Sequence, residues 1–319
     1  MNVAIVGAGM AGAAAARALA DAGCTVELFD KSRGAGGRMA TRRRTDPAGR
    51  TLAFDHGAQW TVAHAPQFAA FLEGAIQSGH AARWPEGPQK DALVGTPGMN
   101  ALAKAALGTL PLTTSFTLDE MHRVADGWWL LSKEGGEAGP FDAVILAMPA
   151  PQQVAVLAPH HQPFADAARS VRYDPSWALM LGFAPEVAGR LATLSHEALT
   201  ERHISWLACD SGKPGRSGAT LVAHADAHWS RDNLEREQDD VCRALTETVC
   251  GSFDLPPPQY MSAHRWRYSR VVEDAALSER FDAQTMLGVA GDWTAGPDID
   301  AAYMSGLGAA RQALAALGR

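Results

Sequence analysis

The stretch VAIVGAGMAG, residues 3–12, predicts a buried strand that runs directly into a tight turn and a helix. Four consecutive apolar residues are typical of a parallel strand covered on both faces, and the alanine-rich residues 13–22 strongly favour a helix. The turn has the GxGxxG spacing, whose glycines make the turn, admit a pyrophosphate close to the backbone and let the helix pack on the strand. The helix N-terminus then faces the phosphates. The residues that we expect to contact the phosphates are Gly7, Gly9, Met10, Ala11 and Gly12.

A second apolar strand, residues 25–29, ends at Asp30. A carboxylate at this place in a Rossmann unit accepts hydrogen bonds from ribose hydroxyls. The glycine- and arginine-rich loop that follows either contacts the cofactor or is a solvated basic turn, and its position directly after Asp30 favours contact. In that case Arg38 is placed to neutralise a diphosphate. The cofactor contacts expected here are Asp30, Lys31, Gly37, Arg38 and Met39.

A third segment, near the C-terminus, indicates which dinucleotide is bound. Gly291 and Asp292 follow an apolar strand and precede a helix predicted over residues 301–317. A carboxylate here can bind a ribitol hydroxyl, and a helix that starts near Asp300 and Ala301 would stabilise negative charge on a flavin. A nicotinamide enzyme has no use for this second site. We therefore expect FAD, bound non-covalently because no cysteine lies near these residues.

Composition limits the class of protein. The chain has 319 residues, is 47% hydrophobic and carries 28 Lys+Arg against 35 Asp+Glu, a formal charge of −7. These values predict a globular protein of about two domains and argue against a nucleic-acid polymer or an anionic membrane as partner. The four cysteines form no CxxC motif, which excludes a zinc ribbon. Without a signal peptide or a long apolar run, we expect a soluble, cytoplasmic protein.

The two ends of the chain share an α/β pattern, while the middle is richer in proline, tryptophan and histidine. We predict an α/β fold in which a Rossmann-type FAD-binding domain carries an inserted α+β substrate domain. The FAD-binding domain is expected to comprise residues 1–61, 93–152 and 275–319. The substrate domain is expected to comprise residues 62–92 and 153–274.

Several further motifs carry a family resemblance, namely FDHGAQWT (54–61), GTPGM (95–99), KPGR (213–216) and AHRW (263–266). Together with the glycine motif, they make the chain resemble the bacterial branch of the renalase family, in the FAD-dependent amine-oxidase superfamily. The resemblance implies the two-domain fold of p-hydroxybenzoate hydroxylase. It also implies an oxidase of 2- and 6-dihydroNAD(P), which transfers hydride to flavin N5 and passes electrons to O2 or another acceptor, giving NAD(P)+ and H2O2. One departure is DIDAAY (298–303), where relatives tend to have Arg-Val-Glu-Gly-Ala.

The segment HRWRYSR, residues 264–270, is basic and aromatic within an acidic chain. In a strand its alternate residues lie on opposite faces, and rings with guanidinium groups nearby suit a dinucleotide-like substrate. The alternative is an edge strand with one solvated basic face. The expected catalytic residues are Gln59, His264, Trp266 and Tyr268, and the expected substrate-binding residues are Trp60, Arg265 and Arg267. Further cofactor contacts are expected at His56, Gly57, Ala58, Gln59 and Ala147.

The expected chemistry needs few protein groups. A dihydropyridine becomes an aromatic cation by losing hydride alone, so no acid–base pair is required and positioning dominates. Two alternatives stay open: an amine oxidase or desaturase on the same fold, and a non-catalytic binding protein of the dissociation-inhibitor type. His224 and His228 have the i, i+4 spacing of helical metal ligands but lack an HExxH pattern, so no metal is expected.

Overall fold

The computed structural model describes residues 1–194 and 199–318 of the chain. A six-stranded sheet in the order β16-β17-β11-β1-β2-β7 is parallel except for the β16–β17 pair. Its strands are β1 (Asn2–Val6), β2 (Thr25–Asp30), β7 (Leu112–Thr114), β11 (Ala143–Leu146), β16 (Phe281–Asp282) and β17 (Leu287–Val289). Strands from both ends of the chain thus meet in one sheet, as the shared pattern of the two ends predicts.

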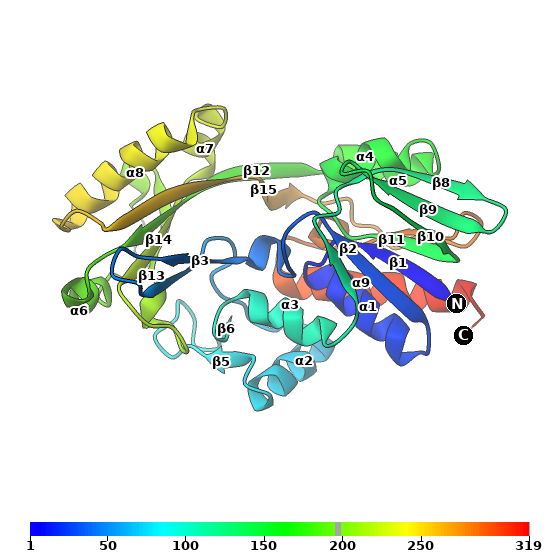
Figure 1. The fold of residues 1–319 in the computed structure, drawn as a ribbon, viewed down its shortest axis with the longest axis horizontal. Coiled ribbons are helices and arrows are strands. Elements are labelled where there is room, and N and C mark those ends of the chain that lie inside the picture. Colours follow the sequence, from blue (N-terminus) through cyan, green and yellow to red (C-terminus); the bar gives the residue numbers. More distant parts are fainter. Residues whose placement is uncertain (195–198, 319) are drawn as a thin grey trace.

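Helices cover one face of this sheet, and a small sheet and two helices cover the other (Figure 1). The first face carries α1 (Met10–Asp21), α2 (Pro66–Gln77), α3 (Asn100–Leu107) and α9 (Ile299–Ala316). The second carries α4 (Ala150–Leu157), α5 (Gln162–Ser170), β8 (Leu118–Val124), β9 (Gly127–Ser132) and β10 (Glu137–Phe141). Small residues let α1 and α9 approach closely, since a Cβ at Gly306 would lie 2.1 Å from the Ala11 carbonyl oxygen.

A second, antiparallel sheet in the order β13-β14-β12-β15 lies at the other end of the molecule (Figure 1). Its strands are β12 (Arg172–Gly182), β13 (Ile204–Cys209), β14 (Thr220–Ala225) and β15 (Tyr260–Glu273). One face is covered by α6 (Ala188–Leu191), α7 (Ala227–Asp232) and α8 (Gln238–Phe253). Against the opposite face lies an arm made of β3 (Thr41–Thr45) and β4 (Thr51–Asp55), whose Leu52 and Phe54 pack on Met180 and Val222.

The segment 62–92, expected in the substrate domain, packs beside the six-stranded sheet. Its helix α2 and its strand β5 (Ala81–Arg83), which pairs with β6 (Leu93–Gly95), belong to the same hydrophobic cluster as α1, α3 and α9. The division into two domains stays a prediction. Within residues 1–194 and 199–318, no helix combines the length and apolarity needed to cross a membrane.

Candidate active site

The three glycines of the first motif differ in what requires them. Gly7 has φ 114°, and a Cβ there would lie 2.7 Å from the Ala147 carbonyl oxygen; a Cβ at Gly12 would lie 1.8 Å from that of Gly7. Gly9 has extended backbone angles that any residue adopts, and a Cβ there would meet nothing within 4 Å. The fold of the chain itself therefore does not need glycine at this position. A glycine here is needed only if a bound group approaches the backbone closely.

The surroundings of Gly9 fit a dinucleotide. The N-terminus of α1 has no side-chain cap, which leaves its first amide groups available to phosphate oxygens. Asp30 is buried at the end of β2, and its two oxygens accept hydrogen bonds of 2.7 Å from the amides of Ala8 and Ser32. Each oxygen keeps a lone pair for a ribose hydroxyl. Lys31 instead lies exposed and donates to Gln152 at 3.2 Å.

Arg38 and Asp292, both expected to contact the cofactor, pair with each other. Nη1 of Arg38 lies 2.7 Å from one carboxylate oxygen of Asp292, and Nη2 lies 2.6 Å from the other. Nη1 also lies 3.3 Å from the carbonyl oxygen of Ser269 on β15. The pair joins the glycine-rich loop, the C-terminal Gly-Asp motif and the second sheet at one point. Its cation is neutralised within the chain, which weakens the expected role of Arg38 towards a diphosphate.

The N-terminus of α9 differs from the expected free positive end. Asp298 caps the helix, its Oδ1 accepting from the amide of Ala301 at 2.7 Å. Asp300 accepts from the amides of His64 and Ala65 and so fastens that segment to the helix. Two carboxylates therefore lie beside the positive N-terminal end of the helix and partly neutralise its charge. The departure noted at residues 298–303 thus changes the electrostatics of this helix end.

Asp55 is the centre of a buried ion cluster that unites three of the renalase-like motifs. Its carboxylate accepts from Thr41 at 2.6 Å and from the amide of Met99 at 2.9 Å, and it pairs with Lys213 and Arg216. Burial raises the pKa of Asp55, but Lys213 and Arg216 outweigh it and hold that pKa below its usual value. The motifs FDHGAQWT, GTPGM and KPGR therefore share a structural role, since residues of all three meet at this carboxylate and hold one another in place.

The same cluster accounts for Gln59. Lys213, itself 2% exposed, donates to Gln59 Oε1 at 2.8 Å and pairs with the buried Asp210. The amide nitrogen of Gln59 donates to the carbonyl oxygens of Asp55 and Gly57. The Gln59 side chain is thus engaged within the chain, and its expected catalytic role stays a prediction. Its contacts make it a part of the buried ion cluster that shapes the loop 57–60.

His264 and Trp266 lie on the face of β15 that looks towards the arm, beside His56. The ring centres are 4.8 Å apart for His56–His264, 5.2 Å for His56–Trp266 and 4.4 Å for His264–Trp266. Trp266 Nε1 donates to the carbonyl oxygen of His56 at 2.7 Å. His56 is 4% exposed, and its Nδ1 has no hydrogen-bond partner. We call these three residues the imidazole–indole cluster.

The loop 57–60, which follows His56, is tightly packed. The amide of Ala58 donates to the carbonyl oxygen of Arg38 at 2.8 Å, and a Cβ at Gly57 would lie 1.9 Å from the same oxygen. The same added Cβ at Gly57 would lie 3.3 Å from the Trp266 ring. Trp60, expected to bind substrate, packs half-buried against the hydrophobic cluster of α1, α3 and α9.

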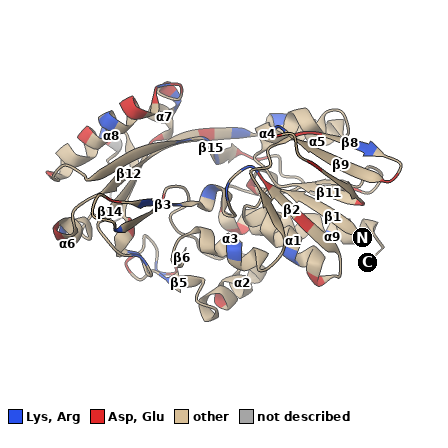
Figure 2. Cartoon of the chain, viewed as in Figure 1, with Lys and Arg blue, Asp and Glu red and all other residues tan. Residues whose placement is uncertain are grey.

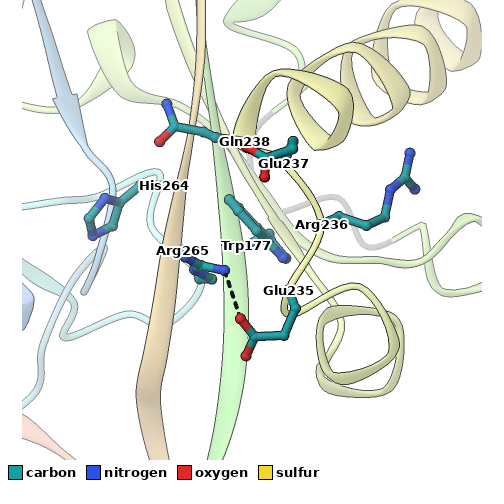
Figure 3. Close-up of a pocket in the computed structure, with 7 residues that line it drawn as sticks. All are labelled: Trp177, Glu235, Arg236, Glu237, Gln238, His264 and Arg265. Atoms are coloured by element: carbon teal, nitrogen blue, oxygen red, sulfur yellow. Dashed lines mark hydrogen bonds and ion pairs between the residues drawn. The ribbon is translucent and has the colours of Figure 1, made fainter.

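Arg265 and Arg267 lie on the opposite face of β15 from His264 and Trp266, and their expected substrate-binding role stays a prediction. Arg267 pairs with Glu235 at 2.5 and 3.0 Å, and Arg265 donates to the Leu234 carbonyl oxygen at 2.6 Å. Arg265 lines a pocket of about 570 Å³ with Trp177, whereas His264 reaches that pocket from the opposite side of the strand (Figure 3). The strand alternation predicted this separation. It did not predict that both arginines would form ion pairs with Glu235.

Tyr268 lies within a bulge of the β12–β15 pairing, apart from the imidazole–indole cluster. Its ring packs edge-on against Tyr173, with ring centres 5.6 Å apart. Both tyrosines line a second pocket, of about 400 Å³, together with Arg231 and Arg267. The expected catalytic role of Tyr268 stays a prediction.

Arg42 is not among the predicted site residues, yet it lies at the edge of the imidazole–indole cluster. Its Nη2 is 3.2 Å from Nδ1 of His264. It belongs to β3, where alternation places Arg42 and Arg44 on one face. Only this strand register could have singled out Arg42.

The histidines near the cluster are held neutral. Burial, with repulsion from His264 and Arg42, lowers the pKa of His56 to about 3. Burial and Arg42 lower the pKa of His264 to about 4, and burial and Lys213 lower that of His224 to about 4. At pH 7 the cluster is therefore uncharged beside a cationic guanidinium. His224 lies on β14 and His228 in α7, and the described residues contain no group of three metal-ligating side chains.

This neutrality predicts an acid-sensitive fold. The pKa of an unfolded histidine is about 6.5, so below that pH the unfolded chain binds protons that the buried rings resist, and the free energy of unfolding falls. For His56 alone we expect a loss of about 2 kcal/mol between pH 7 and 5. Urea unfolding at both pH values measures it: His56→Leu should shrink the loss, and the exposed His122→Leu should not. An equal loss in wild type and His56→Leu would contradict the prediction.

Known proteins match the chain along its length. Residues 5–75 match the NAD(P)-binding Rossmann-like domain, and residues 81–314 match the flavin containing amine oxidoreductases. The chain belongs to the flavin containing amine oxidoreductase family and is an FAD-dependent oxidoreductase. Within this family it is renalase-like: it is 26% identical to renalase of Mus musculus over 315 residues, covering 89% of each chain.

Solved structures share the fold at low identity. A protein of Exiguobacterium assigned as a protoporphyrinogen oxidase has a TM-score of 0.72 at 14% identity, covering 100% of this chain and 99% of its own. Cyclohexylamine oxidase of Brevibacterium oxydans has a TM-score of 0.71 at 13% identity, with the same coverage. These structures confirm the expected fold class. The family match confirms the cofactor FAD and the enzyme class, which sets the non-catalytic alternative aside.

Proposed function

We propose that this enzyme oxidises the 2- and 6-dihydro isomers of NAD(P) to NAD(P)+ and passes the electrons to O2, giving H2O2. The observation that carries the proposal is the pairing of an uncharged imidazole–indole cluster with the cation of Arg42. Flat rings suit the dihydronicotinamide, and a cation nearby suits a substrate with anionic phosphates. The similarity to renalase supports the same substrate class.

An amine oxidase would need a different electrostatic environment. Its substrate arrives largely as an ammonium ion, which a guanidinium repels and a carboxylate attracts. Among the described residues, no carboxylate forms an ion pair with Arg42, His56 or His264. The charges at this place therefore favour an anionic substrate over a cationic one.

The residues of the chain mainly hold and shield the substrate. Bound FAD supplies a hydride acceptor. His56, His264 and Trp266 form a wall that can hold a planar ring and keep water away, and their neutrality leaves no acid to protonate it. Because hydride loss gives the pyridinium directly, no residue has to move a proton during substrate oxidation.

The deciding experiment is anaerobic reduction of the flavin. Purified protein is mixed with 2- or 6-dihydroNAD and, separately, with a panel of mono- and polyamines, while the flavin absorbance is followed. We expect the dihydronicotinamides to bleach the flavin, and admission of air to restore it with one H2O2 per turnover. Rapid bleaching by an amine and none by the dihydronicotinamides would refute the proposal.

His264→Ala tests the wall directly. Removing one of its three rings should slow flavin reduction by about tenfold because the substrate ring is held less well, while the FAD content stays unchanged. Arg265→Ala is the matched control, since its side chain lies on the opposite face of the same strand and should change the rate less than twofold. Loss of FAD from His264→Ala would instead indicate a structural role.

A further inference from the structure

Two arginines of β3, Arg42 and Arg44, lack an acidic partner. Arg38 pairs with Asp292 and Arg50 with Asp46, but none of the ion pairs formed by the described residues involves Arg42 or Arg44. Figure 2 shows Lys and Arg colour on β3 beside the second sheet. Alternation places Arg42 and Arg44 on one face of β3, where their like charges repel each other. An anionic ligand would relieve that repulsion.

A second observation points to the same place. Arg42 contacts His264, and His264 packs edge-on against His56, whose buried Nδ1 lacks any hydrogen-bond partner. Buried polar atoms in native proteins nearly always have partners, so an unpaired one indicates a group that is supplied from outside. A guanidinium without a carboxylate partner and a ring nitrogen without a hydrogen-bond partner thus lie on either side of His264.

The arginines that the sequence offered for phosphate binding are occupied elsewhere. Arg265 and Arg267 contact Glu235, and Arg38 is neutralised by Asp292. Arg42 is the guanidinium that contacts the imidazole–indole cluster, where the proposed function places the dihydronicotinamide ring. A single ribose separates that ring from the phosphates, so a phosphate group falls within reach of a neighbouring arginine.

We propose that Arg42, with Arg44 on the same face of β3, binds the phosphate groups of the dinucleotide substrate. This inference rests on the proposed function, because that function supplies the phosphates. The planar guanidinium suits phosphate, since its parallel N–H groups bind two oxygens at once. The diphosphate of FAD offers the same chemistry, so the test must separate the two sources.

The test uses the FAD-loaded enzyme and three variants: Arg42→Gln, Arg44→Gln and the matched control Arg43→Gln, whose side chain points to the other face of β3. The dissociation constants of 6-dihydroNAD and of its phosphate-free riboside come from the concentration dependence of anaerobic flavin reduction. We expect Arg42→Gln to weaken the binding of 6-dihydroNAD by about 10- to 100-fold, which corresponds to the loss of one charged hydrogen bond. The binding of the riboside should change by less than about twofold. Arg44→Gln should have a smaller effect in the same direction, and Arg43→Gln none.

FAD affinity and pyrophosphate binding complete the test. FAD fluorescence titration should give the same affinity in wild type and Arg42→Gln; a large loss of FAD would assign the arginines to the cofactor and overturn the inference. An equal loss for dinucleotide and riboside would also overturn it. If no dihydronicotinamide reduces the wild-type flavin, the proposed function fails. The site is then judged by inorganic pyrophosphate, whose perturbation of the flavin spectrum should disappear in Arg42→Gln, and binding that is absent or unchanged would refute it.

Discussion

Alanine at Gly9 should remove tight FAD binding and leave the apoprotein folded, whereas alanine at Gly12 should prevent folding. At Gly12 the added Cβ would lie 1.8 Å from the carbonyl oxygen of Gly7, a backbone atom that cannot move without displacing β1 from α1. Such a clash costs more than about 3 kcal/mol. At Gly9 the Cβ meets no protein atom within 4 Å, so only a bound diphosphate would collide with it.

The two variants are compared by thermal unfolding without FAD and by FAD fluorescence titration. For Gly9→Ala we expect stability within about 1 kcal/mol of wild type, the usual cost of alanine at an N-cap, and FAD affinity reduced by about 100-fold. Gly74→Ala in α2, where a Cβ is equally unhindered, serves as control and should leave FAD binding unchanged. Normal FAD affinity in Gly9→Ala would show that the diphosphate lies elsewhere.

The features that sequence predicted well are local. The apolar run, the spacing of three glycines and the alanine-rich helix lie within about twenty residues, and each follows from backbone sterics and packing. Asp30 and the C-terminal Gly-Asp motif follow from their places at strand ends. Alternation predicted the two faces of residues 264–267, since side chains of a regular strand alternate whatever their partners are, but it did not predict the bulge that holds Tyr268.

The features that sequence did not predict depend on distant partners. Whether Arg265 is free depends on Glu235, thirty residues away, and the role of Gln59 depends on Lys213, 154 residues away. A lysine is ordinarily exposed, so nothing local indicates that Lys213 is buried; two carboxylates from separate segments make its burial possible. Arg42 escaped prediction for the same reason, because its contact with His264 joins residues 222 positions apart and depends on the register of β3.

Lys213→Met should be the most destabilising single change in the buried ion cluster. Asp55, Asp210, Lys213 and Arg216 balance two negative charges with two positive ones, all nearly inaccessible to water. Removing one cation leaves a buried carboxylate uncompensated, which costs about 3–5 kcal/mol. Lys133→Met, which breaks the exposed pair with Asp119, should cost less than about 1 kcal/mol. Urea unfolding at pH 7 measures both.

The pH dependence separates this charge effect from simple loss of packing. Burial raises the pKa of Asp210, and without Lys213 the folded protein should bind a proton there that the unfolded chain releases near pH 4. The Lys213→Met penalty, measured against wild type, should therefore shrink as the pH falls from 7 to 5. The double variant Lys213→Met/Asp210→Asn removes the unpaired charge and should recover at least about 2 kcal/mol of the loss. The contrary outcome is a penalty that stays the same at both pH values and a second substitution that recovers nothing. The side chains would then contribute volume and not charge, and balanced charges could not be what orients the loop of Gln59.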